Sequence, residues 1–162
     1  MIRVAILTVS DSSAAGTRED WSGAALGARV AELGWTVSET AIVADEIPAI
    51  LAALEVMSRA DVILTTGGTG VAARDVTPEA TLQFSPRQVP GIAEVMRAEG
   101  RKSTRFAALS RGVAVTRRET LVVNLPGSPR GAVESLSAVA DLIPHVVDLL
   151  HGRTAHVQKP SS

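Results

Sequence analysis

Residues 65–70 (Thr-Thr-Gly-Gly-Thr-Gly) directly follow an apolar segment that is typical of a buried strand. Glycines permit a sharp turn and let backbone N–H groups come close to an anion, and threonine hydroxyls add further donors. The segment lacks the Gly-Lys-Ser/Thr of a Walker A loop and the spacing of the dinucleotide-binding G-x-G-x-x-G loop. It therefore predicts a phosphate-binding turn of another kind, with an ordinary tight turn as the alternative.

A carboxylate follows this turn within residues 74–78 (Arg-Asp-Val-Thr-Pro). An aspartate beside a bound phosphate repels it unless a cation lies between them, and Mg²⁺ is usually held by one or two carboxylates plus phosphate oxygens. Asp75 is thus either a magnesium ligand or part of an Asx-turn leading into Thr77. Asp45 follows the preceding predicted strand and is either a second metal ligand or the N-cap of the next helix.

Two further segments contain groups that could bind an anion. Residues 109–111 (Leu-Ser-Arg) precede a predicted hairpin, and residues 124–129 (Asn-Leu-Pro-Gly-Ser-Pro) join a buried strand to a helix start. Free backbone amides at such a helix start can bind a phosphate. Ordinary turn and cap chemistry explains the second segment equally well.

The residue types that are missing narrow the chemistry. The chain has no Cys and no Tyr, and its three histidines, at positions 145, 151 and 156, lie close to the C-terminal end. Disulfides, iron–sulfur clusters and thiolate catalysis are excluded, and a Ser-His-Asp triad is disfavoured. The remaining carboxylates, hydroxyls, arginines and amides suit phosphoryl or nucleotidyl transfer, where positioning and charge neutralisation supply most of the rate.

Length and composition indicate one globular domain. The chain has 162 residues, of which 46% are hydrophobic and only 2% aromatic, so we expect an aliphatic core. The net charge of −1 argues against a nucleic-acid partner. Basic residues gather in 97–118, which is either a solvated surface or a landing area for a polyanionic small molecule. We see neither a membrane-spanning stretch nor a secretion signal, and expect a cytoplasmic protein.

The elements that must position these groups follow from hydrophobic periodicity and turn residues. Alternating strands and helices in the first half predict parallel strands joined by crossover helices. The second half predicts more helices and a hairpin of two strands. Expected strands cover 2–9, 35–43, 61–66, 112–116 and 120–125, and expected helices cover 22–33, 46–59, 78–84, 91–100 and 128–143. Thr77 and Ser128 should cap their helices, Pro144 should kink or restart the last one, and 151–162 should fray.

Taken together, residues 66–70 (Thr-Gly-Gly-Thr-Gly) and 74–81 (Arg-Asp-Val-Thr-Pro-Glu-Ala-Thr) resemble the signature of the MoaB/Mog family of molybdenum cofactor biosynthesis. The likeness runs over about residues 3–150. It includes the segments 7–11 (Leu-Thr-Val-Ser-Asp), 44–46 (Ala-Asp-Glu), 109–111 and 124–129. It implies an α/β fold over 1–150: a single Rossmann-like three-layer α/β/α domain with a mostly parallel sheet and an added β-hairpin, commonly a homotrimer.

The characterised enzymes of that family are molybdopterin adenylyltransferases. The resemblance implies binding of molybdopterin and ATP with Mg²⁺, and transfer of AMP to the molybdopterin phosphate with release of pyrophosphate. By motif, Asp45 and Asp75 match the functional, metal-binding aspartates, although Ala44 replaces a usual proline. The matching substrate-binding positions are Ser10, Thr66, Gly67, Gly68, Thr69, Gly70, Ser110, Asn124, Pro126, Gly127 and Ser128.

Three alternatives compete with this hypothesis. The chain could bind molybdopterin without catalysis, or act as a scaffold for other cofactor-assembly proteins. It could also be a nucleotide pyrophosphatase like the CinA domain, which carries a related glycine loop. That group shows two adjacent aspartates after the loop, and here Arg74 stands in the first place. The expected partners are small molecules, with no nucleic acid and no membrane.

Overall fold

A computed structural model describes residues 1–153 and shows a five-stranded sheet with strand order β2-β1-β3-β5-β4. Four strands are parallel, and β4 joins β5 as an antiparallel hairpin, which confirms the predicted sheet. The strands are β1 (Arg3–Val9), β2 (Thr36–Val43), β3 (Val62–Thr66), β4 (Ala114–Arg117) and β5 (Thr120–Leu125). Because β2, β1, β3 and β5 run parallel, their carboxyl ends lie along one edge of the sheet.

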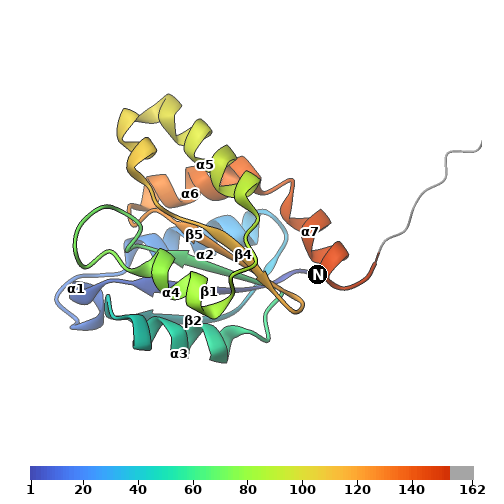
Figure 1. The fold of residues 1–162 in the computed structure, drawn as a ribbon, viewed down its shortest axis with the longest axis horizontal. Coiled ribbons are helices and arrows are strands. Elements are labelled where there is room, and N and C mark those ends of the chain that lie inside the picture. Colours follow the sequence, from blue (N-terminus) through green and yellow to red (C-terminus); the bar gives the residue numbers. More distant parts are fainter. Residues whose placement is uncertain (154–162) are drawn as a thin grey trace, which may run out of the picture.

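Helices cover both faces of this sheet and give the predicted three layers (Figure 1). One face carries α2 (Trp21–Glu32), α5 (Pro90–Ser103), α6 (Pro129–Val139) and α7 (Ile143–Leu150). The other face carries α3 (Ile47–Met57) and α4 (Thr77–Phe84). The short α1 (Asp11–Ala14) follows β1, and the 3₁₀ helix η1 (Arg105–Leu109) follows α5.

Alternation along β1 divides the core between these faces, because successive side chains of a strand point to opposite sides. Val4 and Ile6 pack in the cluster that contains α2 and α6, whereas Ala5 and Leu7 pack in the cluster that contains α3 and α4. Every one of these side chains is buried. The near-continuous apolar sequence of the central strands is thus explained by helices on both faces.

The helix starts were predicted with mixed success. Ser128 caps α6, since its hydroxyl accepts a hydrogen bond from the amide of Gly131 at 3.1 Å. The predicted caps Asp45 and Thr77 are wrong: the N-caps of α3 and α4 are Glu46 and Val76, and neither makes a side-chain cap bond. Both helices have proline in the first turn, which removes an amide that would otherwise need a partner.

The chain ends α6 at Val139 and restarts as α7, with Pro144 in its first turn, as the sequence predicts. The hairpin connection is shorter than expected, because Arg117 still belongs to β4 and only two residues separate the strands. Residues 154–162, most of the predicted frayed tail, lie outside the described residues, as does His156. No helix in residues 1–153 is both long and apolar enough to span a bilayer.

Candidate active site at the carboxyl edge of the sheet

The parallel strands bring the predicted site residues to one edge. Ser10 follows β1, Asp45 follows β2 after one residue, Gly67 follows β3, and Pro126 follows β5. The carboxyl ends of parallel strands are where open α/β sheets bind ligands. Four segments that are far apart in the sequence therefore form one site.

Gly67 and Gly68 turn the chain sharply, with φ angles of +100° and +67°. All four carbonyl oxygens of residues 67–70 accept hydrogen bonds from the protein. Thr77 donates from Oγ1 to Gly67 at 2.9 Å and from its amide to Gly68 at 3.1 Å. Arg111 donates from its amide to Thr69 and from Nε to Gly70, each at 2.7 Å. The carbonyls are thereby turned toward the protein.

The amides of this loop have a different environment. Gly67 N donates to the Leu125 carbonyl at 3.1 Å, but no acceptor within residues 1–153 takes the amides of Gly68, Thr69 and Gly70. Successive amides without partners in a turn of positive φ form a cradle for an anion. This geometry fits the predicted phosphate-binding turn.

Asp75 lies against this loop. A Cβ built on Gly70 would lie 2.8 Å from Asp75 Oδ2, and that oxygen accepts the Ala72 amide at 2.9 Å. The alternative of an Asx-turn leading into Thr77 is wrong, because the Thr77 amide donates to Gly68 instead. Arg111 Nη2 also donates to the Asp75 carbonyl at 2.7 Å, so this arginine fixes both ends of the segment 70–75.

Asp45 approaches the same loop from β2. A Cβ built on Gly68 would lie 3.1 Å from Asp45 Oδ1. The other oxygen, Oδ2, accepts the Asp11 amide at 2.9 Å, and Asp11 Oδ1 accepts the Asp45 amide at 3.0 Å. Burial, followed by the negative charges of Asp11 and Asp75, raises the pKa of Asp45 above its usual value. The two predicted functional aspartates are therefore close enough to repel each other.

Arg74 neutralises the acidic groups around Asp45. Its guanidinium forms a two-bond pair with Asp11 and a 3.0 Å contact with Glu46. The hydrogen bonds from Arg74 lower the pKa of Asp11, which remains a carboxylate. Asp11 and Glu46 thus have an internal cation, whereas Asp45 and Asp75 share none.

The donor set around the loop fits a magnesium ion. Asp45 Oδ1 and Asp75 Oδ1 receive no hydrogen bond from any residue in 1–153, so each carboxylate keeps one oxygen for a ligand. That part of the chain holds no cluster of three potential ligand side chains. Mg²⁺ takes its remaining ligands from water and from substrate phosphates, so one or two carboxylates suffice.

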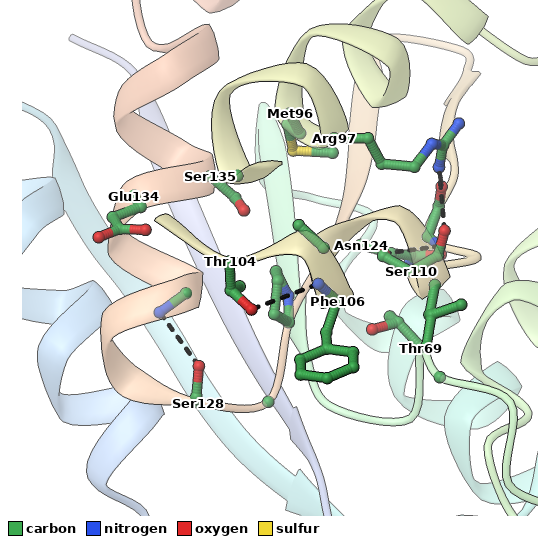
Figure 2. Close-up of a pocket in the computed structure, with 18 of the residues that line it drawn as sticks. Thr69, Met96, Arg97, Thr104, Phe106, Ser110, Asn124, Ser128, Glu134 and Ser135 are labelled. Atoms are coloured by element: carbon green, nitrogen blue, oxygen red, sulfur yellow. Dashed lines mark hydrogen bonds between the residues drawn. The ribbon is translucent and has the colours of Figure 1, made fainter. Parts of the chain in front are cut away.

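A pocket of about 430 Å³ opens beside the loop (Figure 2). Thr69, Gly70 and Asp75 form one side of it, and Ser110 lies near them. Apolar contacts come from Ala93, Met96, Phe106, Ala107 and Leu109, and the polar side chains of Arg97, Thr104, Glu134 and Ser135 also line the pocket. Phe106 is 69% exposed, and Figure 2 shows its ring below Thr104, between Ser128 and Thr69. A pocket that combines apolar contacts with polar groups beside the glycine loop suits a flat heterocycle that carries a phosphate.

Some predicted substrate-binding residues have their polar atoms occupied by the fold. The Asn124 amide donates to Thr65 and Thr81 at 3.0 Å each and accepts from the Val113 amide at 3.2 Å. Thr66 Oγ1 donates to the Pro126 carbonyl at 2.7 Å. Asn124 and Thr66 therefore shape the site by tying its segments together.

The other predicted residues are divided between two pockets. Ser110, Thr69 and Gly68 line the first pocket, whereas Ser10, Thr66 and Gly67 line a second pocket of about 330 Å³ beside β1. Gly127 and Ser128 line both, and Pro126 lines the first. The sequence placed all these residues in one site and could not show this division.

A family model described as "Probable molybdopterin binding domain" matches residues 5–145. The chain belongs to this family. Curated relatives named molybdopterin adenylyltransferase include that of Helicobacter pylori J99, 39% identical over 98% of this chain and 93% of the relative. That of Escherichia coli K12 is 37% identical over 96% of this chain and 82% of the relative.

Solved structures agree with this family membership. The molybdopterin biosynthesis enzyme MoaB of Thermus thermophilus superposes with a TM-score of 0.88 at 48% identity, covering 94% of this chain and 98% of that chain. The protein CinA of Thermoplasma acidophilum superposes with a TM-score of 0.68 at 18% identity, over 87% of this chain and 97% of that chain, which shows a shared fold alone.

Several residues of the site in this family member have roles that the sequence does not predict. Arg74 and Arg111 stand in the motifs 74–81 and 109–111, but no sequence pattern predicts that they hold the acidic groups and the glycine loop in place. Within the basic segment 97–118, which could have bound a polyanion, two arginines are engaged by the protein itself. Arg97 donates to the Gly112 carbonyl, and Arg117 pairs with Glu55. Met96 and Phe106 gave no signal, since apolar helical residues usually indicate core.

Proposed function

We propose that this protein is a molybdopterin adenylyltransferase, which transfers AMP from ATP to the terminal phosphate of molybdopterin and releases pyrophosphate. The observation that carries the proposal is the row of amides at Gly68, Thr69 and Gly70, which have no acceptor within residues 1–153. They lie between two carboxylates that each keep one oxygen without a partner in those residues. Amides of this kind hold phosphate oxygens, and the carboxylates supply a place for the accompanying cation. The named relatives agree with this activity.

The reaction needs no general base. A phosphate oxygen of molybdopterin attacks the α-phosphorus of ATP, and the bond from that phosphorus to the pyrophosphate oxygen breaks. The attacking oxygen is already anionic at neutral pH, so no proton has to be removed. None of the described residues that line the two pockets is a histidine. The amides of residues 68–70 orient the phosphate and stabilise the charge that develops in the transition state.

Asp45 and Asp75 would hold Mg²⁺ through their free oxygens. When bound, the ion neutralises charge on the phosphates and on the departing pyrophosphate. Arg74 supports this arrangement indirectly, because it binds Asp11, whose main chain and side chain fix Asp45. Arg111 does the same for Asp75 through the carbonyl of that residue.

The first pocket is the better place for the pterin. Its wall of Met96, Phe106 and Leu109 offers apolar contact to a flat ring, and its other end reaches the amides and Asp75. A pterin in this pocket would direct its phosphate toward the glycine loop. Ser110, at the same end, has a hydroxyl that accepts only a long bond of 3.3 Å from the Gly112 amide.

The test is incubation of the purified protein with molybdopterin, ATP and Mg²⁺, followed by measurement of pyrophosphate and of adenylylated molybdopterin. We expect both products in equal amounts, and neither when molybdopterin, ATP or Mg²⁺ is left out. Pyrophosphate formed from ATP without molybdopterin would indicate the pyrophosphatase alternative. Tight molybdopterin binding with no pyrophosphate would indicate a binding or scaffold protein.

We also propose that the protein acts as a homotrimer in the cytoplasm, together with other proteins of molybdenum cofactor assembly. This part follows from the family resemblance. Light scattering after size exclusion should give three times the 16.8 kDa mass of one chain. A mass of one chain at micromolar concentration would contradict the trimer, and pull-down from cell extract would test the partners.

A further inference from the structure

Glu79 lies in the first turn of α4, and its carboxylate is bound to Arg111. Oε1 of Glu79 accepts a hydrogen bond from Arg111 Nη1, and Oε2 accepts a longer one, of 3.4 Å, from Nη2. Neither residue is among the described residues that line the first and second pockets. The pair is therefore placed to act on a reaction in those pockets only through other groups of the protein.

The guanidinium of Arg111 connects Glu79 to the glycine loop and to the proposed metal site. Its Nε donates to the Gly70 carbonyl and its Nη2 to the Asp75 carbonyl, each at 2.7 Å. All three nitrogens of this side chain thus have an acceptor. The donors of a planar guanidinium point in fixed directions relative to one another. An acceptor that holds Nη1 therefore also determines where Nε and Nη2 point.

The bond to the Gly70 carbonyl orients the peptide between Gly70 and Val71. In a planar trans peptide the C=O and N–H bonds point in opposite directions. A carbonyl held toward Arg111 therefore turns the Val71 amide away from it. That amide, like those of Gly68 and Thr69, has no acceptor within residues 1–153. The Arg111 side chain thus orients a fourth amide, directly after the three that we propose to hold phosphate.

The bond to the Asp75 carbonyl fixes the residue that we propose as a metal ligand. The Asp75 amide donates to the Ala72 carbonyl at 3.0 Å, and Asp75 Oδ2 accepts the Ala72 amide at 2.9 Å. The Arg111 bond adds a restraint from outside this short turn. A site of this kind requires its ligands to be held within about 0.5 Å of the productive position. A change in the direction of the guanidinium would move the main chain of Asp75, and its carboxylate with it.

The remaining carbonyls of the loop do not depend on the guanidinium. Thr77 holds those of Gly67 and Gly68, and the main-chain amide of Arg111 holds that of Thr69. The amides of residues 68–70 should therefore stay in place when the Arg111 side chain is released. This separates the expected effect on catalysis from any effect on phosphate binding.

A second ion pair of the same kind shows what such a pair does away from the site. Arg117 pairs with Glu55, and the two side chains are 33% and 56% exposed, against 38% and 45% for Arg111 and Glu79. The Arg117 guanidinium lies 4.4 Å from the centre of the Phe84 ring. Pairs with this exposure contribute little to stability. The two pairs thus differ chiefly in what each guanidinium holds.

We propose that Glu79 is a positioning residue for adenylyl transfer. Its carboxylate fixes the Arg111 guanidinium in the direction that holds the Gly70 and Asp75 carbonyls, and so places the Val71 amide and the Asp75 carboxylate relative to each other. The proposal rests on the proposed function and adds to it a residue outside both pockets.

The first experiment compares Glu79→Gln with Glu55→Gln, the matched change in the second ion pair. Glu79→Gln should lower kcat about tenfold, because small displacements of reacting groups are costly, and leave the dissociation constant for molybdopterin unchanged. Mn²⁺ serves as a paramagnetic probe for the metal site. Its dissociation constant should rise about tenfold in Glu79→Gln, since groups that orient metal ligands have effects of this size. Glu55→Gln should change none of these values.

The second experiment restores the cation without the side chain. Arg111→Ala should lose activity and regain part of it when methylguanidinium is added, because the Arg111 side chain is partly exposed and a small cation can reach its place. The double variant Arg111→Ala, Glu79→Ala should not respond to methylguanidinium. Sodium chloride at the same concentration is the control for ionic strength, and retained molybdopterin binding shows that each variant is folded.

The outcomes distinguish this inference from the proposed function. With an active wild type, an unchanged kcat and unchanged Mn²⁺ affinity in Glu79→Gln would overturn the role of Glu79. Equal loss of kcat in Glu79→Gln and Glu55→Gln would trace the effect to stability alone, and equal rescue by methylguanidinium with and without the Glu79 carboxylate would show that Glu79 does not direct the cation. Absence of pyrophosphate from the wild type would reject the proposed function, and this inference with it.

Discussion

The two edges of the parallel sheet carry similar residues and use them differently. At the amino edge, Asp61 precedes β3, and both of its oxygens have partners. Oδ2 accepts the Arg3 amide at 2.8 Å, and Oδ1 lies 3.3 Å from Arg3 Nη2 and 3.1 Å from His151 Nε2. At the carboxyl edge, Asp45 and Asp75 each accept one amide and keep one oxygen without a partner in residues 1–153.

The pKa values of Asp61 and Asp45 are shifted in opposite directions. Burial raises the pKa of Asp61, but hydrogen bonds from Arg3 outweigh it, and the net pKa is lowered. Burial and neighbouring carboxylates raise the pKa of Asp45. Both oxygens of Asp61 are satisfied within the fold, whereas Asp45 keeps one oxygen that a ligand can take. Polar groups without a partner within residues 1–153, more than residue type, therefore distinguish the candidate site from the amino edge of the sheet.

The largest expected effect is on catalysis at the carboxyl edge. Asp75→Asn removes a negative charge beside the phosphate cradle while keeping the side chain's shape, so pyrophosphate formation should fall at least about 100-fold. Molybdopterin binding, measured by fluorescence, and the melting temperature should stay close to wild type. Turnover at the wild-type rate would show that Asp75 holds no metal.

The next effect concerns the turn that presents the amides. In Gly67→Ala, the added Cβ would lie 2.2 Å from the Val9 carbonyl oxygen at a φ of +100°. We expect a loss of about 2–3 kcal/mol in the free energy of unfolding, measured in urea, together with loss of activity. Gly27→Ala is the matched control, because nothing lies within 4 Å of the new Cβ and the site is inside α2. It should stabilise by about 0.5–1 kcal/mol. Similar stabilities for both variants would contradict the account of the turn.

A substitution at the amino edge of the sheet should lower the stability of the fold and leave catalysis unchanged. Asp61→Asn places an amide donor against donors, and we expect a cost of about 1–2 kcal/mol with normal kcat. The folded pKa of Asp61 lies below its ordinary value of 3.8. Its stabilisation is therefore complete above that value and is lost as the pH falls through the folded pKa. The wild type should lose its advantage over the variant in acid, as urea melts at pH 3 and pH 7 would show. A constant difference at both pH values would contradict this role.

The smallest effect tests the indirect support of Asp45. Arg74→Lys keeps the charge but cannot form the two-bond pair with Asp11. We expect a three- to tenfold loss in kcat/KM, about 1 kcal/mol, and a higher Mg²⁺ concentration for half-maximal activity. Glu99 pairs with Lys102 on the surface of α5, and Lys102→Ala should change neither. An unaltered Mg²⁺ requirement in Arg74→Lys would remove Arg74 from the support of Asp45.

Much of the fold followed from local patterns. Hydrophobic periodicity predicted all five strands and the alternation of the first half, and Ser128 followed by proline predicted the start of α6. Asp45 and Thr77 show the limit of such rules. Both have good capping side chains, but Asp45 bonds to Asp11 and Thr77 bonds to the glycine loop, and tertiary partners outweighed the local cap.

The order of the elements, the edge at which the strands end and the glycines that turn the chain there could all be read from the sequence, because these features depend on residues close together along the chain. Folding in three dimensions sets which amides and oxygens have no partner within residues 1–153, and it divides the predicted substrate residues between two pockets that share Gly127 and Ser128. Those properties depend on contacts such as Arg111 with Gly70, which join residues 41 positions apart, and no local pattern encodes them.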